Sequence, residues 1–428
     1  MRFLFVLLWF CLSQAIAGPK IEHWVLPSGA RVYFVENHDL PILDVQVDFP
    51  AGDARNPSGK AGLASLTASL LDAGTPELDE EHISARLVEL GARLATSADH
   101  DKASVSLRTL SSREEKEGAL ALFTAVLSAP TFPAAAFERE KTRSIEALKD
   151  ADTRPDAIAA KRFAQALYPD HPYGRVPTAE SVAMITREDL VAFHKAHYVA
   201  HGAVISILGD VSRAEAETIA RNITAALPAG HAPAPLPIVT LPARETIKVP
   251  HPAVQAHIHI GLPAIRRSAS PEYFALLVGN YTLGGGGFVS RLMKEVREKR
   301  GYAYSVYSYF GPRQLEGPFE IGLQTKREQV EDALKVVQDV LERFLAEGPT
   351  EEELTAAKKN LVQGQALRID SNAKLLGYLS LIGFYDLPLD YLDQFPKKVA
   401  AVTREDVKAA FRRTVKPENL VTVIVAGD

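Results

Sequence analysis

The chain has 428 residues, more than one ordinary hydrophobic core holds, so we expect two or more domains. Its composition, 46% hydrophobic and 24% charged, is that of a globular protein and excludes a disordered or fibrous chain. A net charge of −5 without a basic stripe argues against a nucleic-acid partner.

Residues 1–17 have the features of a secretory signal peptide. Arg2 precedes an apolar run at residues 3–12, and Ala15-Ile16-Ala17 forms a small-residue cleavage site. The run is too short to span a bilayer, and the only cysteine, Cys11, falls within it. We therefore expect a mature chain that is exported to a bacterial periplasm, soluble, free of disulfides and not attached to a membrane.

Alternating apolar residues predict that the mature chain begins as an antiparallel sheet. The expected strands are residues 23–26, 31–35, 42–49, 93–98 and 103–110. Apolar residues at helical spacing predict helices between and after these strands. The expected helices are residues 60–73, 79–90, 114–128, 134–151 and 155–167.

Two segments of the chain repeat one pattern. Residues 185–210 read ITREDLVAFHKAHYVAHGAVISILGD and residues 402–428 read VTREDVKAAFRRTVKPENLVTVIVAGD. Each is a helix capped by a threonine, then a turn, then an apolar strand that ends in Gly-Asp. The repeat predicts an α+β fold in which two homologous domains follow in tandem, each a sheet with helices packed on it.

A proline-rich stretch separates the two predicted domains. The expected N-terminal domain is residues 18–230, the extended linker is residues 231–252 and the C-terminal domain is residues 253–428. A crevice between the two domains is the expected binding site.

The stretch from Tyr281 to Tyr309 combines a glycine run, a basic helix and an aromatic strand. Four glycines, Gly284, Gly285, Gly286 and Gly287, precede a helix that is expected from Phe288 onward, with Val289, Leu292, Met293 and Val296 as its apolar positions. Gly301 is expected to end this helix in a left-handed cap. The reversal there would bring Arg297 and Tyr304 together, where both side chains can donate hydrogen bonds to a carbonyl oxygen.

Other interpretations of this stretch remain open. Basic residues in a last helical turn are favoured by the helix dipole, whatever their function. The glycine run can simply form the turn into the helix, and it lacks the pattern of a P-loop or a Rossmann fingerprint.

Histidines offer two candidate metal sets. His194, His197 and His201 share a helix face, and His257 and His259 point the same way from a strand. Neither set has a carboxylate at a suitable offset, so packing or capping roles are favoured. Asp99-His100-Asp101 is typical of a solvated turn, and the sequence has no serine-nucleophile motif.

Four sequence segments resemble the pitrilysin/insulinase-type zinc metallopeptidases, the inverzincins. These are AGDARNPSGKAGLASLTASLLDAGT (residues 51–75), HPYGR (residues 171–175), the paired TRED…GD segments and LGGGGFVSRLMKEVREKRGYAYSVYS (residues 283–308). The resemblance covers essentially the whole mature chain. It implies repeated α+β domains whose halves face each other like a clamshell around a peptide, with dimers among bacterial relatives of this length.

The chain departs from this family at the zinc motif. Where the family has His-x-x-Glu-His, the matching positions are Ser65, Ala68 and Ser69. Two serine hydroxyls do not replace imidazoles on zinc, and Glu138 or Glu140 at the third ligand's expected place is not enough to hold the ion. We therefore predict no metal and no cofactor in this chain, with zinc held by a partner.

The resemblance assigns roles in the second half. Arg297 and Tyr304 match an Arg and a Tyr that bind the substrate backbone and the oxyanion in the family. Gly284 to Gly287 resemble a substrate-facing glycine stretch in non-catalytic subunits of related processing peptidases. The resemblance thus predicts the zinc-free subunit of a heterodimeric periplasmic metallopeptidase that cleaves unstructured peptides, with a paralogous His-x-x-Glu-His chain as partner.

Two alternatives belong to other functional classes. One is a relative that captures or scaffolds peptides without cleaving them. The other is a structural subunit of a larger assembly in which Arg297 and Tyr304 are kept only for packing.

Overall fold

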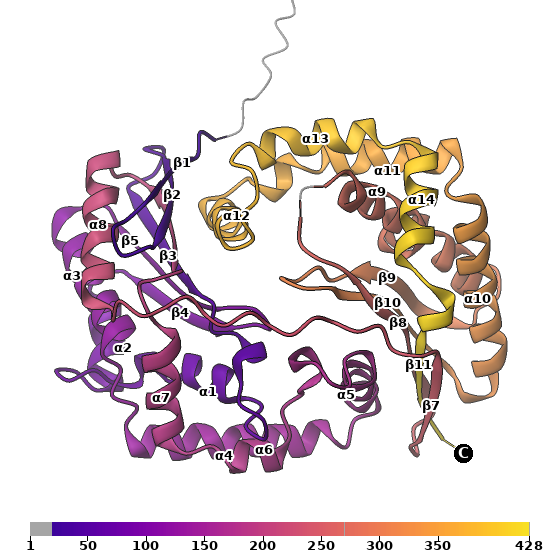
Figure 1. The fold of residues 1–428 in the computed structure, drawn as a ribbon, viewed down its shortest axis with the longest axis horizontal. Coiled ribbons are helices and arrows are strands. Elements are labelled where there is room, and N and C mark those ends of the chain that lie inside the picture. The colour runs from indigo at the N-terminus through magenta and orange to yellow at the C-terminus, as the bar shows by residue number, and fades with distance from the viewer. Residues whose placement is uncertain (1–18, 269, 428) are drawn as a thin grey trace, which may run out of the picture.

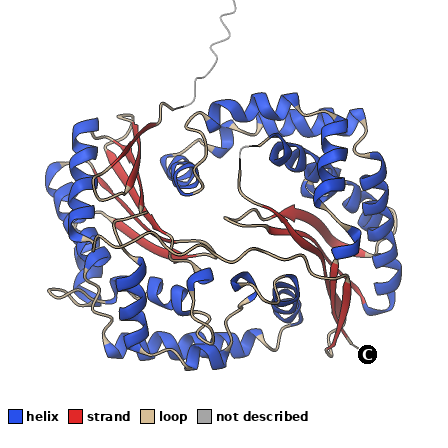
Figure 2. Ribbon diagram, viewed as in Figure 1, coloured by secondary structure: helices blue, strands red, loops and turns tan. Residues whose placement is uncertain are grey.

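The computed structural model describes residues 19–268 and 270–427. The predicted signal peptide and Cys11 lie outside this range, as does Asp428 of the second repeated segment. The described chain forms two halves, each built on one sheet (Figure 1). Most helices lie on the outer sides of the two sheets, which face each other across the molecule (Figure 2).

The N-terminal half contains a six-stranded sheet with the order β1-β2-β6-β3-β5-β4. Its strands are β1 (Glu22–Val25), β2 (Arg31–Glu36), β3 (Ile42–Phe49), β4 (Arg93–Ala98), β5 (Ala103–Leu110) and β6 (Val204–Gly209). Its helices are α1 (Leu63–Ser69), α2 (Glu80–Glu89), α3 (Arg113–Ser128), α4 (Ala134–Ala151), α5 (Pro155–Leu167), α6 (Ala179–Ala183), α7 (Arg187–His197) and α8 (Arg213–Ala226). The bounds agree closely with the predicted elements, except that the first helix is short and continues as a 3-10 turn at Leu71–Ala73.

The C-terminal half contains a five-stranded sheet with the order β7-β11-β8-β10-β9. Its strands are β7 (Glu245–Pro250), β8 (Gln255–Ile265), β9 (Ala303–Phe310), β10 (Gly317–Lys326) and β11 (Val421–Ala426). Its α-helices are α9 (Pro271–Asn280), α10 (Val330–Glu347), α11 (Glu351–Gln363), α12 (Asn372–Phe384), α13 (Tyr391–Ala401) and α14 (Arg404–Thr414).

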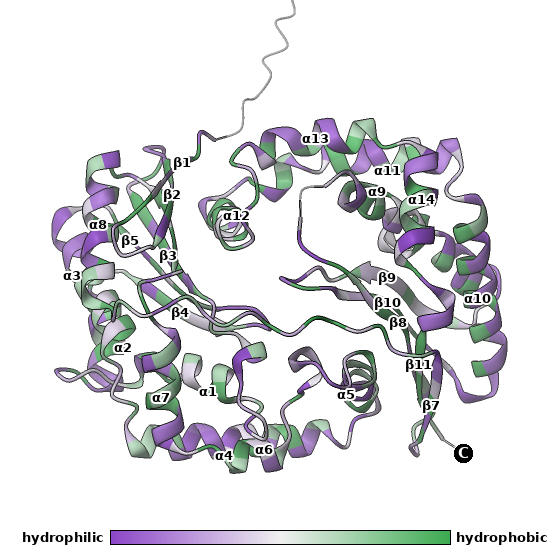
Figure 3. Ribbon diagram, viewed as in Figure 1, coloured by the Kyte–Doolittle hydropathy of each residue, from purple (hydrophilic) through white to green (hydrophobic). Residues whose placement is uncertain are grey.

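The repeated segments occupy equivalent places in the two sheets. Helices α7 and α14 both begin at a capping box, on Thr186 and Thr403. The strand that follows each helix is apolar and buried. The hydrophobic character of one of these strands, β11, can be followed by its green colour in Figure 3. Strand β6 pairs parallel with β2 and antiparallel with β3, and β11 pairs in the same way with β7 and β8. The two halves are therefore two copies of one α+β domain.

Two helices cross between the halves. Helix α5, from the N-terminal half of the sequence, packs on β11 and β8, and α12, from the C-terminal half, packs on β6, β3 and β2. Both helices lie between the two sheets (Figure 1). Phe163 of α5 and Leu379 of α12 consequently belong to one continuous buried core. The two halves are thus joined by shared packing as well as by the chain between them.

The connection between the halves has no helix or strand from residue 227 to residue 244. The last part of the predicted linker is different, because Glu245–Pro250 forms strand β7 at the edge of the C-terminal sheet. Within residues 19–268 and 270–427, no helix combines the length and the apolar character that crossing a bilayer requires.

Candidate functional site

The glycine run continues helix α9 instead of forming an open loop. Tyr281–Gly285 is a π-helical turn, Gly287–Val289 is a 3-10 turn and Met293–Glu298 is π-helical. The helix predicted from Phe288 therefore begins only after Ser290, whose backbone is extended. As a result Val289, expected on the buried stripe, is 55% exposed, while Leu292 and Val296 are buried as predicted.

The four glycines have different environments. Gly284 is buried, and a Cβ there would come within 2.5 Å of the Ser308 backbone nitrogen, so close packing against β9 requires glycine. Gly285 and Gly287 are exposed, and Gly286 is half-buried. Gly287 has a φ of +61°, a left-handed conformation, with open space around it. Gly285, Gly286 and Gly287 can therefore contact a ligand directly, whereas the buried Gly284 cannot.

Arg297 and Tyr304 lie together, as the sequence predicted. Gly301 has a φ of +65° and donates its N–H to the carbonyl of Arg297 at 2.9 Å, which reverses the chain between the two residues. The Arg297 guanidinium carbon lies 4.6 Å from the centre of the Tyr304 ring and 4.8 Å from the centre of the Phe288 ring. This is cation–π geometry at both rings.

The polar groups of this pair are free within the described part of the chain. No hydrogen bond or ion pair there involves the Arg297 guanidinium or the Tyr304 hydroxyl, and the Tyr304 side chain is 81% exposed. The two groups therefore present unused hydrogen-bond donors to solvent. Such donors can bind a carbonyl oxygen or a carboxylate.

A β-bulge directs Tyr304 outward. Strand β9 pairs with β10 through Val306 opposite Leu323 and Ala303 opposite Thr325, so Tyr304 and Ser305 together oppose one residue. Tyr304 and Val306 therefore do not share a face of the strand, as regular alternation along a strand would require. Strand β9 is the edge strand of its sheet, and the bulge turns Tyr304 away from the core.

The residues at the zinc-motif positions do not fit a zinc ion. Ser65 donates a hydrogen bond to Asp53 at 3.3 Å, Ser69 donates to the carbonyl of Leu66 at 3.0 Å, and Ala68 is buried. Burial raises the pKa of the Asp53 carboxyl, which the hydrogen bonds from Asn56 and Ser65 partly oppose. Hydroxyls of this kind, engaged with neighbouring oxygens, are not the imidazole or thiolate ligands that zinc takes.

The carboxylates at the third-ligand position lie on α4. Glu138 is exposed, and Glu140 lies 3.6 Å from Arg143 in an ion pair. Among the residues that the structure describes, no three His, Cys, Asp or Glu side chains are grouped so as to hold a metal ion.

His194 and His259 are packed against neighbouring side chains, whereas His201 is exposed and lies beyond the end of α7, so it does not share a helix face with His194. His194 is buried, stacks on Tyr198 and contacts the carbonyl of Leu127 at 2.9 Å. His259 lies 2.7 Å from Glu320, whose other carboxylate oxygen accepts a hydrogen bond from Tyr309 at 2.6 Å. These contacts are those of packed and hydrogen-bonded side chains.

The Asp99-His100-Asp101 segment is only partly the solvated turn that the sequence suggested, because Asp99 is exposed but Asp101 is buried. Asp101 is only 3% exposed and accepts hydrogen bonds from Tyr173 at 2.5 Å and Tyr385 at 2.9 Å, and from the backbone N–H of Gln314 at 2.8 Å. Burial and the nearby Arg313 lower the pKa of His100 to about 4. Asp101 therefore connects the two halves. The polar composition of the segment did not predict that Asp101 is buried between them.

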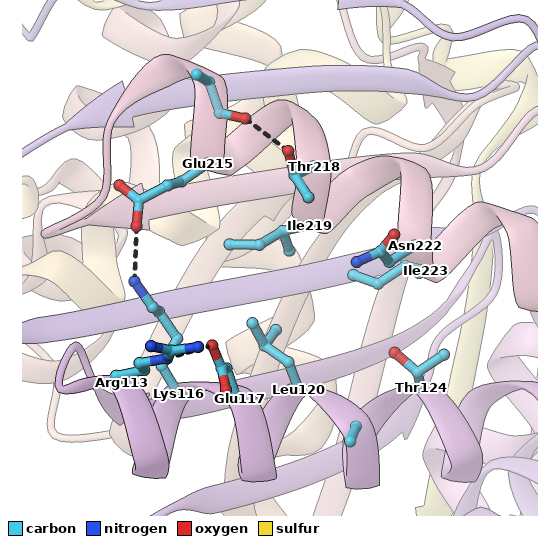
Figure 4. Close-up of a pocket in the computed structure, with 12 residues that line it drawn as sticks. Arg113, Lys116, Glu117, Leu120, Thr124, Glu215, Thr218, Ile219, Asn222 and Ile223 are labelled. Carbon is cyan, nitrogen blue, oxygen red and sulfur yellow. Dashed lines mark hydrogen bonds and ion pairs between the residues drawn. The ribbon is translucent and has the colours of Figure 1, made fainter.

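A groove of about 830 Å³ lies on the outside of the N-terminal half, between α3 and α8 (Figure 4). Its lining is mainly alanine, threonine, leucine and isoleucine, with Lys116 paired to Glu215 at 2.8 Å near one end. Its side chains include no nucleophile activated by a base and no metal-ligand set, so it is not a candidate catalytic site.

Two family models match adjacent parts of the chain. Residues 31–178 match Insulinase (Peptidase family M16), and residues 184–361 match the Peptidase M16 inactive domain. The non-peptidase homolog YmxG of Helicobacter pylori is 24% identical over 417 residues, which cover 97% of this chain and 95% of that protein.

Solved structures agree with these matches. The peptidase M16 inactive domain from Pseudomonas fluorescens has 38% identity and a TM-score of 0.91, with 95% of this chain and 98% of that chain covered. The periplasmic protease PqqL of Escherichia coli shares the fold, with a TM-score of 0.81 and 18% identity. The alignment includes 96% of this chain and 46% of the PqqL chain. The chain therefore belongs to the M16 peptidase family, and its full-length matches support an inactive member of that family.

Proposed function

We propose that this chain is the zinc-free subunit of a heterodimeric periplasmic M16 peptidase. Its partner is a paralogous chain with the His-x-x-Glu-His motif, and its substrates are unstructured peptides. In this assembly Arg297 and Tyr304 bind the peptide backbone, while the partner supplies the zinc.

The observation that carries the proposal is a contrast between two regions of one chain. At the zinc-motif positions the serine hydroxyls are engaged with Asp53 and a backbone carbonyl. In the second region the Arg297 guanidinium carbon lies 4.6 Å from the centre of the Tyr304 ring, and the hydrogen-bond donors of both side chains have no acceptor within the described residues. Exposed donors that no protein group satisfies are suited to a ligand that arrives from outside.

The donor pair suits the chemistry of amide-bond attack. When a nucleophile adds to a peptide carbonyl, negative charge develops on the oxygen, and donors already in place stabilise that charge without reorganising. A guanidinium offers a planar set of N–H donors and a permanent positive charge, and a phenol adds one O–H. The exposed Gly285 and Gly287 and the half-buried Gly286 precede Phe288 in the chain, next to the path we propose for the peptide.

A second function is favoured by one specific observation. The similar protein of Helicobacter pylori, which matches over almost its whole length, is described as a non-peptidase homolog. The alternative is therefore a peptide-binding or scaffold protein that does not take part in cleavage. In this case Arg297 and Tyr304 would bind peptides, and no assembly with another chain would cleave them.

The proposed function is tested with variants of the donor pair. We expect Arg297→Ala and Tyr304→Phe each to lower the peptidase rate of the reconstituted heterodimer about 100- to 1,000-fold, the usual loss for one oxyanion donor. Assembly, measured by size-exclusion chromatography, should not change. Tyr302→Phe is the matched control, because it removes a phenol hydroxyl two residues away. Full activity in both variants would refute the assignment.

A further inference from the structure

Phe288 is a large apolar side chain in an exposed position, with 62% of its surface accessible. The centre of its ring lies 4.8 Å from the Arg297 guanidinium carbon. The centre of the Tyr304 ring lies 4.6 Å from the same carbon. Arg297 therefore contacts one aromatic ring from the glycine segment and one from the edge strand.

The segment that carries Phe288 is fixed by local contacts. The Ser290 hydroxyl and the Ser290 backbone N–H both donate to the carbonyl of Gly287, at 2.7 Å and 3.0 Å. Ser290 is fully buried, and Gly287 has the left-handed φ of +61° that most side chains avoid. The 3-10 turn between these two residues thus holds Phe288 in place above Arg297.

We propose that Phe288 is a positioning residue for Arg297, and that the glycine run is the support that places it. The inference rests on the proposed function, because positioning matters only if Arg297 binds substrate. The guanidinium carbon lies 4.8 Å from the centre of the ring, and none of the guanidinium N–H groups donates to an oxygen or nitrogen of the described residues. The contact therefore restrains Arg297 and leaves its donors available for a peptide carbonyl.

The contact itself is tested by the NMR signal of the Arg297 Nε–Hε group, assigned from its loss in Arg297→Lys. Ring currents from Phe288 should displace this signal in the wild type. We expect Phe288→Leu to move it toward the position of a free arginine and Phe288→Tyr to leave it in place. Gly287→Ala, which strains the left-handed turn without filling occupied space, should move it in the same direction as Phe288→Leu.

The consequence is tested by cleavage of fluorescein-labelled β-casein, an unstructured substrate, by the heterodimer reconstituted from full chains. Phe288→Leu should lower kcat/KM about two- to five-fold, as expected for one exposed cation–π contact. Phe288→Tyr should restore the wild-type value. Val289→Ala is the matched control, because it shortens the neighbouring exposed apolar side chain, and it should leave kcat/KM unchanged.

The outcomes separate this inference from the proposed function. If Arg297→Ala cleaves β-casein as fast as the wild type, the proposed function fails, and with it any role in positioning. If Arg297→Ala is impaired while Phe288→Leu keeps both its activity and the Arg297 signal, only the role of Phe288 is refuted. Equal loss in Phe288→Leu and Phe288→Tyr would also refute it.

Discussion

Arg297 differs from most arginines of this chain in having no acceptor within the described residues. Arg291, six residues earlier, shows the contrast, because it pairs with Glu353 at 2.6 Å and with the carbonyl of Gly348 at 3.0 Å. Arg291 therefore joins structural elements, whereas Arg297 has cation–π contacts with two aromatic rings and no hydrogen bond or ion pair within the described residues. The sequence could predict that Arg297 and Tyr304 meet, since Gly301 determines the reversal. It could not predict that Phe288 joins them, because that depends on the left-handed Gly287.

The geometry of Arg297 predicts that charge alone is insufficient. Lysine keeps the positive charge at this position but has neither a planar group to lie over the Tyr304 ring nor a fork of donors. We expect Arg297→Lys to lower kcat/KM of the heterodimer about 100-fold or more, close to the alanine variant. Steady-state kinetics on a quenched fluorescent peptide would measure this. Wild-type kinetics in the lysine variant would mean that the pair acts only through net charge.

His100 predicts a pH dependence of stability. Its pKa falls from the ordinary 6.5 to about 4 in the folded chain, because burial and Arg313 disfavour the charged ring. The unfolded chain therefore binds more protons between these two values, and the folded chain loses stability as pH falls through that window. Urea unfolding at pH 7 and pH 5 should show a smaller difference in His100→Gln than in the wild type. If the stability difference between pH 7 and pH 5 were the same in His100→Gln and the wild type, His100 would not be the group that causes this pH dependence.

Helices and strands with regular periodicity were predictable from the sequence. Strands β4 and β5 and helices α4 and α5 have the predicted bounds, because their apolar residues recur without interruption. The segment from Tyr281 to Ser290 was not predictable in this way. Its π-helical and 3-10 turns depend on the packing of Gly284 against Ser308 and on the conformation of Gly287, which periodicity does not reveal.

The end of α12 predicts a measurable link between the halves. Tyr385 follows this helix and donates a hydrogen bond to the buried Asp101 carboxylate at 2.9 Å. Its removal leaves one carboxylate oxygen with a single remaining donor, the backbone N–H of Gln314. We expect Tyr385→Phe to lower the free energy of unfolding by about 1.5–3 kcal/mol, as for a hydrogen bond to a charged group.

The matched control for this prediction is Tyr378→Phe. Tyr378 lies on the same helix, is partly buried, and has no hydroxyl hydrogen bond within the described residues. Its free energy of unfolding should change by less than about 0.5 kcal/mol. Equal effects of the two substitutions in urea unfolding would show that the Asp101 contact does not stabilise the molecule.

The whole molecule is two copies of one domain that exchange a helix. The repeated TRED helices and the strands that follow them predicted the two copies. The two strands, β6 and β11, occupy equivalent positions in the two sheets. The exchange of α5 and α12 was not predictable, because an apolar helix face does not specify which sheet it covers. This exchange gives the two halves a shared core beside the separate core of the N-terminal half, and Tyr385 adds a hydrogen bond to Asp101 between the halves.

The shared packing of the two halves has a consequence for the proposed assembly. With α5 and α12 both packed between the sheets, the chain presents Arg297 and Tyr304 on an already formed surface. Because these donors are already positioned before the partner binds, less conformational entropy is lost when the site forms. In the proposed assembly, this chain would therefore supply a preformed half of the active site.

In the proposed assembly, cleavage requires two chains. The most direct measurement compares peptidase activity on a quenched fluorescent peptide for this chain alone, for the paralogue with the zinc motif alone, and for the mixture, with and without chelator. We predict activity only in the mixture, abolished by chelator. A mixture no faster than the paralogue alone would contradict the claim and would favour a peptide-binding or structural role for this chain.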